Sequence, residues 1–215
     1  MHYTSVLFDL DGTLLDTLGD LTAAMNRTLT RHGLPERTRQ QMRAALGNGA
    51  RRLMELSVPA GTDGALFETL LAEYNADYAA HCRIETAPYP GVDALLRQLH
   101  AQGRKLAIVS NKPDEAVRAL RAEFFADTVP IAVGEKQGIR RKPAPDTLLA
   151  AMAQLGAERT STVYVGDSEV DIATARAAGL PCISVLWGFR DRDLLEQAGA
   201  QQFAADADEL AGLLD

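Results

Sequence analysis

The chain has 215 residues, and its apolar and charged fractions are those of an ordinary folded protein. Its formal net charge of −7 argues against nucleic acids and anionic membranes as partners, because neither attracts an acidic protein. The two cysteines, Cys82 and Cys182, lie far apart without metal-ligand spacing, so we expect reduced thiols. We find neither a signal-peptide pattern nor a run of about 20 apolar residues, and therefore expect a cytoplasmic protein.

Short apolar runs rich in β-branched residues predict a parallel sheet, since strands buried on both faces are apolar almost throughout. From residue 105 onward these runs alternate with helical patterns, which indicates right-handed crossovers and a doubly wound, Rossmann-like α/β core. The predicted strands are 5–10, 105–110, 129–133, 162–165 and 181–186, and the predicted core helices are 92–101, 114–123, 145–155 and 171–178.

The chain between the first two strands is too long for a simple crossover, which needs perhaps a dozen residues. It contains no convincing strand pattern and predicts helices at 18–31, 36–46, 50–56 and 65–81. We therefore expect a core domain of residues 1–16 and 83–215 and an inserted helical domain of residues 17–82.

Polar residues gather where the predicted strands end, and ligands of an open parallel sheet bind beyond the carboxyl ends of its strands. Asp9 and Asp11 end the first strand, Ser110 and Asn111 end the second, and Asp167 and Asp171 follow the fourth, while Lys142 begins a neighbouring helix.

These residue types suit phosphoryl transfer with a magnesium ion. Carboxylates alone would repel a phosphate ester, whereas a divalent cation held by Asp9 and Asp167 would reverse that effect. Lys142 and Ser110 would stabilise the phosphoryl oxygens. A carboxylate can attack phosphorus, and Asp11, placed where the chain turns at Gly12, would serve as general acid and then base.

Each feature alone has a plainer interpretation. An isolated Asp-x-Asp at a strand end is often a turn former, and Asp171 could simply cap or charge the first turn of its helix. Their occurrence together, in order, at consecutive strand ends favours the functional interpretation.

Four motifs in the same order resemble the signatures of the haloacid dehalogenase superfamily in its aspartyl phosphatase form. They are DLDGTLLDT at 9–17, SNKP at 110–113, KPAPD at 142–146 and GDSEVD at 166–171. Dehalogenases themselves lack the second aspartate, so Asp11 points away from carbon–halogen cleavage.

The resemblance implies a role for each matching residue. Asp9 is the expected nucleophile and Asp11 the expected acid/base. Phosphate binding is expected from Thr13, Ser110, Asn111 and Lys142. Mg²⁺ is expected on Asp9, Asp167 and the Asp11 carbonyl, with Asp171 supporting the metal shell.

Within the superfamily the chain is most similar to phosphoglycolate phosphatases, which implies 2-phosphoglycolate as substrate and the insertion as a cap. The stretch LGNGARRL at 46–53 is similar to the cap loop of that group, and Arg51 or Arg52 could bind a small carboxylate there. A plain helix junction with surface arginines is the other interpretation. The segment GEKQGIR at 134–140 departs from the short glycine–aspartate link usual before the lysine motif.

Other uses of such a site stay open at this point. Pyrophosphate hydrolysis and a sugar-phosphate mutase would need the same four motifs. A non-catalytic receiver-like module would also use acids and a lysine, but it needs no helical insertion and no second aspartate.

Overall fold

The computed structural model describes residues 3–215 and divides into two compact units. The larger unit combines the described part of Met1–Leu15 with Pro88–Asp215, and the smaller unit is Asp16–Ala87. The inserted domain expected at 17–82 falls inside the smaller unit. The chain divides at two short strands, β2 (Leu15–Asp16) and β3 (Ala87–Pro88), which pair with each other.

The larger unit is built on a six-stranded parallel sheet in the order β5-β4-β1-β6-β7-β8. The central strand β1 (Ser5–Phe8) lies between β4 (Lys105–Pro113) and β6 (Thr162–Gly166). The order reverses at β1, and this reversal creates the crevice in which doubly wound folds bind ligands. The outer strands are β5 (Ile131–Glu135), β7 (Cys182–Val185) and β8 (Gln202–Ala204). The expected α/β fold class is confirmed.

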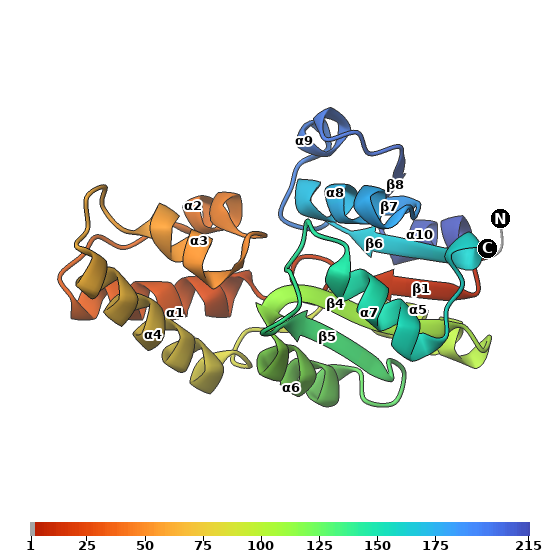
Figure 1. Cartoon of the computed structure of the whole chain (residues 1–215), viewed down its shortest axis with the longest axis horizontal. Coiled ribbons are helices and arrows are strands. Elements are labelled where there is room, and N and C mark those ends of the chain that lie inside the picture. The colour runs from red at the N-terminus through yellow and green to blue at the C-terminus, as the bar shows by residue number, and fades with distance from the viewer. Residues whose placement is uncertain (1–2) are drawn as a thin grey trace. The chain divides into compact units, whose positions relative to one another are not determined.

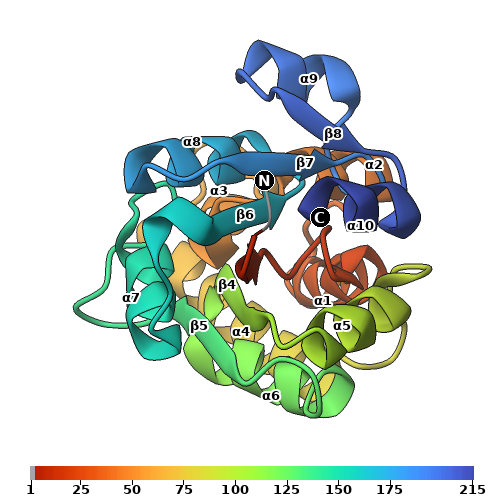
Figure 2. The same ribbon diagram turned by 90° about the vertical axis from the view of Figure 1, so that its right-hand side faces the viewer.

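Helices cover both faces of this sheet, with α7 (Asp146–Leu155) and α8 (Glu169–Ala178) on one face (Figures 1 and 2). On the other face lie α5 (Val92–Ala101) and α10 (Ala207–Leu214), while α6 (Asp114–Phe124) packs against β4 and β5. The short elements η1 (Arg159–Ser161) and α9 (Arg192–Gln197) complete the unit.

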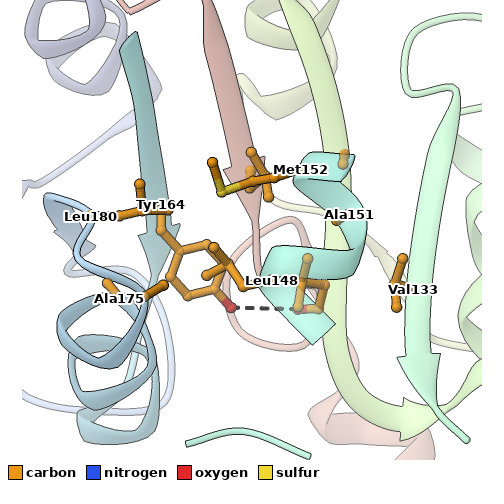
Figure 3. Packing of buried hydrophobic residues seen from close by; sticks show 11 residues of the cluster. Val133, Leu148, Ala151, Met152, Tyr164, Ala175 and Leu180 are labelled. Carbon is orange, nitrogen blue, oxygen red and sulfur yellow. Dashed lines mark hydrogen bonds between the residues drawn. The ribbon is translucent and has the colours of Figure 1, made fainter. Parts of the chain in front are cut away.

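A buried apolar cluster joins α7 and α8 to the sheet (Figure 3). Side chains alternate across a strand, so Leu7, Val109 and Tyr164 point from three neighbouring strands into the same layer. There they meet Leu148 and Ala175 of the two helices. The Tyr164 ring belongs to this layer, while its hydroxyl group makes hydrogen bonds at the polar end of the sheet.

The smaller unit consists of four helices, α1 (Leu18–Arg31), α2 (Arg39–Ala45), α3 (Gly49–Ser57) and α4 (Gly64–His81). Helix α1 packs against α4 and α2 and carries a buried apolar stripe that includes Leu21, Met25 and Leu29 at helical spacing. The buried carboxylate of Asp20 accepts hydrogen bonds from the backbone N–H groups of residues 84–86. This contact ties the returning chain to the start of α1.

Several predicted boundaries differ from the structure for local reasons. Helix α2 begins at Arg39 rather than residue 36, because Thr38 and Gln41 form a capping box. Helix α8 begins two residues before Asp171, because Ser168 occupies the capping position. Strand β4 continues past Ser110 to Pro113, where it pairs again with β5 after a register shift. The predictions did not include β2, β3, β8, η1, α9 or α10.

No helix in the described part of the chain, residues 3–215, is long and apolar enough to cross a membrane.

Candidate active site

The loop after β1 carries two aspartates at the carboxyl edge of the sheet. Asp9 continues the strand, since its N–H donates to the Val165 carbonyl at 2.8 Å, and its side chain is buried. Asp11 is partly exposed. The chain turns at Gly12, whose φ is +86°. A Cβ added at this position would lie only 2.4 Å from Asp167 Oδ2. Both the backbone conformation and the lack of space therefore exclude a larger residue. The first motif therefore brings its own backbone against the aspartate of the fourth.

Lys142 is the centre of the site. Its Nζ lies 2.8 Å from Asp9 Oδ1 and 2.8 Å from Asp171 Oδ1, and it donates to the hydroxyl of Tyr164 at 3.0 Å. The side chain is only 2% exposed. Burial would lower the pKa of Lys142, but Asp171 and Asp9 outweigh it and raise the pKa above the ordinary lysine value. Lys142 therefore holds its positive charge between two carboxylates.

The side chain of Asp171 is completely buried, and both of its carboxylate oxygens accept hydrogen bonds. Its Oδ2 accepts hydrogen bonds from the N–H and hydroxyl groups of Ser168, and its Oδ1 accepts from Tyr164 at 2.9 Å as well as meeting Lys142. Burial acts to raise the pKa of Asp171, yet Lys142 and these hydrogen bonds lower it. Asp171 thus completes the capping box of Ser168 in the first turn of α8 and also borders the site, so both interpretations of this residue fit the geometry.

Asp167 faces the same space from the end of β6. Its Oδ2 accepts from the backbone N–H of Phe189 at 2.7 Å, and its Oδ1 accepts from the Thr13 hydroxyl at 3.3 Å. Burial, followed by repulsion from Asp171, raises the pKa of Asp167 to about 7. The hydrogen bond from the Phe189 N–H, then Lys142, and then Arg190, which pairs with Glu169 at 2.7 Å, partly offset this rise.

Asp9, Asp167 and Asp171 form a buried group that could hold a metal ion, since one oxygen of each lies within 4.8 Å of the others. Burial and the charges of Asp171 and Asp167 raise the pKa of Asp9 well above its usual range, and Lys142 opposes this rise. Lys142 contacts Asp9 and Asp171, so ionisation of all three buried carboxylates needs further positive charge. The donors are all oxygen atoms, which suits a hard divalent cation such as Mg²⁺.

The second motif lies within β4, in the stretch between Val109 and Pro113 where the register with β5 shifts. The Asn111 amide donates to the Lys142 carbonyl at 3.0 Å and accepts from the Lys142 N–H at 2.8 Å. Asn111 therefore fixes the backbone that carries Lys142. The Ser110 hydroxyl oxygen accepts from the Lys112 N–H at 3.1 Å.

The structure gathers nearly all of the expected site residues at one edge of the larger unit, with Arg51 as the exception. Arg51 belongs to the smaller unit, where it makes two hydrogen bonds to Glu68 at 2.9 and 2.8 Å. Its guanidinium group also lies 5.3 Å from the centre of the Phe67 ring. The gathered residues are Asp9, Asp11, Thr13, Ser110, Asn111, Lys142, Asp167 and Asp171.

Sequence reasoning missed several residues of this edge. Tyr164 reads as one more apolar position in a buried strand, and the sequence carries no signal that its hydroxyl contacts Lys142 and Asp171. Lys112 belongs to the second motif, but its sequence context predicted no role for it. Its Nζ lies 2.9 Å from Asp11 Oδ1. The Phe189 N–H contact is a backbone interaction that no side-chain pattern reports.

Comparison with known proteins agrees with this geometry. The family model for haloacid dehalogenase-like hydrolases matches residues 6–185. The chain belongs to this family. The hydrolase is 37% identical over 187 residues to a phosphoglycolate phosphatase of Xanthomonas campestris pv. campestris, covering 86% of this chain and 84% of the relative. It is also 31% identical to an N-acetylmuramic acid 6-phosphate phosphatase of Pseudomonas aeruginosa, covering 100% of this chain and 96% of the relative.

A solved structure matches the whole chain. The crystal structure of a protein from Lactobacillus delbrueckii subsp. bulgaricus, proposed as a phosphoglycolate phosphatase, superposes with a TM-score of 0.94 at 36% identity. The match covers 100% of this chain and 99% of that protein. The expected superfamily, and the similarity to phosphoglycolate phosphatases within it, are confirmed. The expectation of a phosphoric monoester hydrolase agrees with the curated relatives, which are named as phosphatases.

Proposed function

We propose that this hydrolase is a Mg²⁺-dependent phosphatase of small phosphomonoesters that works through an aspartyl-phosphate on Asp9. The observation that carries the proposal is the contact of Lys142 with Asp9 and Asp171 beside Asp167. A cluster of buried carboxylates around one lysine is costly unless it serves an anionic ligand and a cation.

The chemistry follows from the residues in two steps. A carboxylate oxygen of Asp9 bonds to phosphorus while the bond from phosphorus to the leaving oxygen breaks, and Asp11 gives that oxygen a proton. Asp11 then takes a proton from water, whose oxygen attacks the phosphorus, and the bond to Asp9 breaks. The products are the alcohol and inorganic phosphate, and Asp9 is regenerated.

Lys142 and Ser110 would stabilise the phosphoryl oxygens, with Thr13 and Asn111 close by. Asp9, Asp167 and the Asp11 carbonyl would hold Mg²⁺, with Asp171 in support, and the ion would supply positive charge that offsets the charge of the phosphate. Ionisation of Asp9 and Asp167 is then favoured, which a nucleophile and a metal ligand both need.

The substrate we propose is 2-phosphoglycolate, a small ester that carries its own carboxylate. The similarity to phosphoglycolate phosphatases supports this choice. In this proposal the smaller unit is a cap that excludes water and recognises the rest of the substrate, and Arg51 is its candidate carboxylate ligand. N-acetylmuramic acid 6-phosphate is a second candidate, because the relative named for it aligns with all of this chain.

The test is phosphate release from purified protein with Mg²⁺ and a panel of phosphate compounds. The panel contains 2-phosphoglycolate, N-acetylmuramic acid 6-phosphate, pyrophosphate and glucose 1-phosphate, with Asp9→Asn as the inactive control. We expect the highest kcat/KM for 2-phosphoglycolate. Isomerisation of glucose 1-phosphate without release of phosphate from any ester would contradict the proposal in favour of a mutase.

A further inference from the structure

Lys112 carries a second buried ammonium group at the active-site edge, distinct from that of Lys142. It lies near the end of β4, two residues after Ser110, whose hydroxyl oxygen accepts from the Lys112 N–H. Its side chain is 5% exposed, and its Nζ stands 2.9 Å from Oδ1 of Asp11, whose side chain is 20% exposed.

The two lysines serve different aspartates. Lys142 contacts Asp9 and Asp171 at 2.8 Å each, whereas Lys112 contacts Asp11. A buried ammonium group needs a nearby carboxylate, and removal of either partner leaves an uncompensated charge. The pair of Lys112 with Asp11 therefore restrains a partly exposed side chain that follows the strand end.

Such restraint matters for the proton transfer assigned to Asp11. A general acid works only when its oxygen lies within hydrogen-bond distance of the leaving oxygen, and small displacements are costly in rate. The Lys112 ammonium group engages Oδ1 of Asp11 and so restricts where the carboxylate lies. We propose that Lys112 is a positioning residue that holds the Asp11 carboxylate for protonation of the leaving group. This inference rests on the proposed function.

The test uses phenyl phosphates whose leaving phenols differ in acidity. An acidic phenol such as p-nitrophenol leaves without help, whereas a weakly acidic phenol needs a proton from Asp11. We expect Lys112→Met to lower kcat/KM for phenyl phosphate by about tenfold, which is part of the general-acid effect. The kcat/KM for p-nitrophenyl phosphate should change far less. The dependence of log kcat/KM on leaving-group acidity thus becomes steeper.

Three further variants separate positioning from a general structural effect. Lys112→Arg keeps the charge and should restore a large part of the loss. Lys112→Met should cost little more in an Asp11→Asn background, because its effect passes through Asp11. Lys105→Met is the matched control, since Lys105 begins the same strand and binds the Gly156 carbonyl instead. It should leave the leaving-group dependence unchanged.

Equal losses for all phenyl phosphates, or losses that add fully to those of Asp11→Asn, would overturn the role of Lys112. Those outcomes leave the proposed phosphatase function in place, because wild-type turnover is measured in the same experiment. Absence of wild-type turnover of every ester would instead overturn the function and this inference with it. Thermal unfolding of each variant shows that the folded protein is being compared.

Discussion

The Nζ atom of Lys142 lies 2.8 Å from Oδ1 of Asp9, and both side chains are almost wholly buried. This contact joins the third motif to the first, across more than half of the chain. The lysine also meets Asp171, so one cation stabilises two carboxylates that would otherwise repel each other. The site is therefore a coupled charge cluster.

Replacement of Lys142 by Met should abolish most turnover. The phosphoryl group loses its lysine and Asp9 loses the charge that favours its ionised form, so we expect kcat/KM to fall by about 100-fold or more. Steady-state phosphate release measures this loss. A variant within threefold of wild type would show that Lys142 has no part in catalysis.

Divalent cations should stabilise the folded protein. Mg²⁺ at 100 times its dissociation constant would contribute about 2.7 kcal/mol by mass action, because the site is absent from the unfolded chain. Thermal unfolding with and without Mg²⁺ measures the effect, and EDTA should remove both the stabilisation and the activity. Asp167→Asn should lose most of the stabilisation. An unchanged response in that variant would place the ion elsewhere.

Asp20 should be essential for the stability of the smaller unit. Its buried carboxylate accepts from three backbone N–H groups of residues 84–86 and from the Thr86 hydroxyl at 2.8 Å. Asp20→Ala leaves these donors without that acceptor, so we expect a loss of about 3 kcal/mol in the free energy of unfolding. Urea denaturation measures it. The exposed Asp127→Asn is the control and should stay within about 0.5 kcal/mol of wild type.

Asp77 should make part of the stability depend on pH. Burial opposes its ionisation, but hydrogen bonds and charge from Arg27 and Arg31 prevail and lower its pKa. A carboxyl group with a lowered folded-state pKa stabilises the protein above its unfolded pKa of about 4, and this contribution disappears as the pH falls through the folded value.

Asp77→Asn should therefore be less stable than wild type at pH 7, by about 1 kcal/mol because both arginines are substantially exposed. The difference should shrink as the pH is lowered below about 4. Urea denaturation from neutral to acidic pH tests this. A difference that stays constant over that range would assign the effect to packing.

The sequence was most informative where local and global signals agree. Buried parallel strands such as 162–165 are nearly continuous apolar runs, and the polar groups at their ends converge once the strands are parallel. Strand β8 was not predicted, because Gln202–Ala204 is short and carries one exposed polar residue. Its place follows from pairing with β7, which is a tertiary contact.

The site could be predicted as a set of residues but not as a set of contacts. The motifs identified Asp9, Lys142 and Asp167, yet the role of Asn111 in fixing the backbone of Lys142 depends on where two distant segments meet. Tyr164 was hidden for the same reason. The roles assigned to the individual site residues remain predictions, as does the role of Arg51 as a ligand of the substrate carboxylate.

The central claim is that Asp9 becomes phosphorylated, and acid quenching followed by mass spectrometry tests it most directly. Asp11→Asn should accumulate the intermediate from p-nitrophenyl phosphate, because that leaving group needs no proton while hydrolysis still needs the base. We predict a phosphoryl group localised by fragmentation to Asp9, and none in the Asp9→Asn, Asp11→Asn double variant. Catalytically competent turnover with no phosphorylated Asp9, or with phosphate on another residue, would contradict the account.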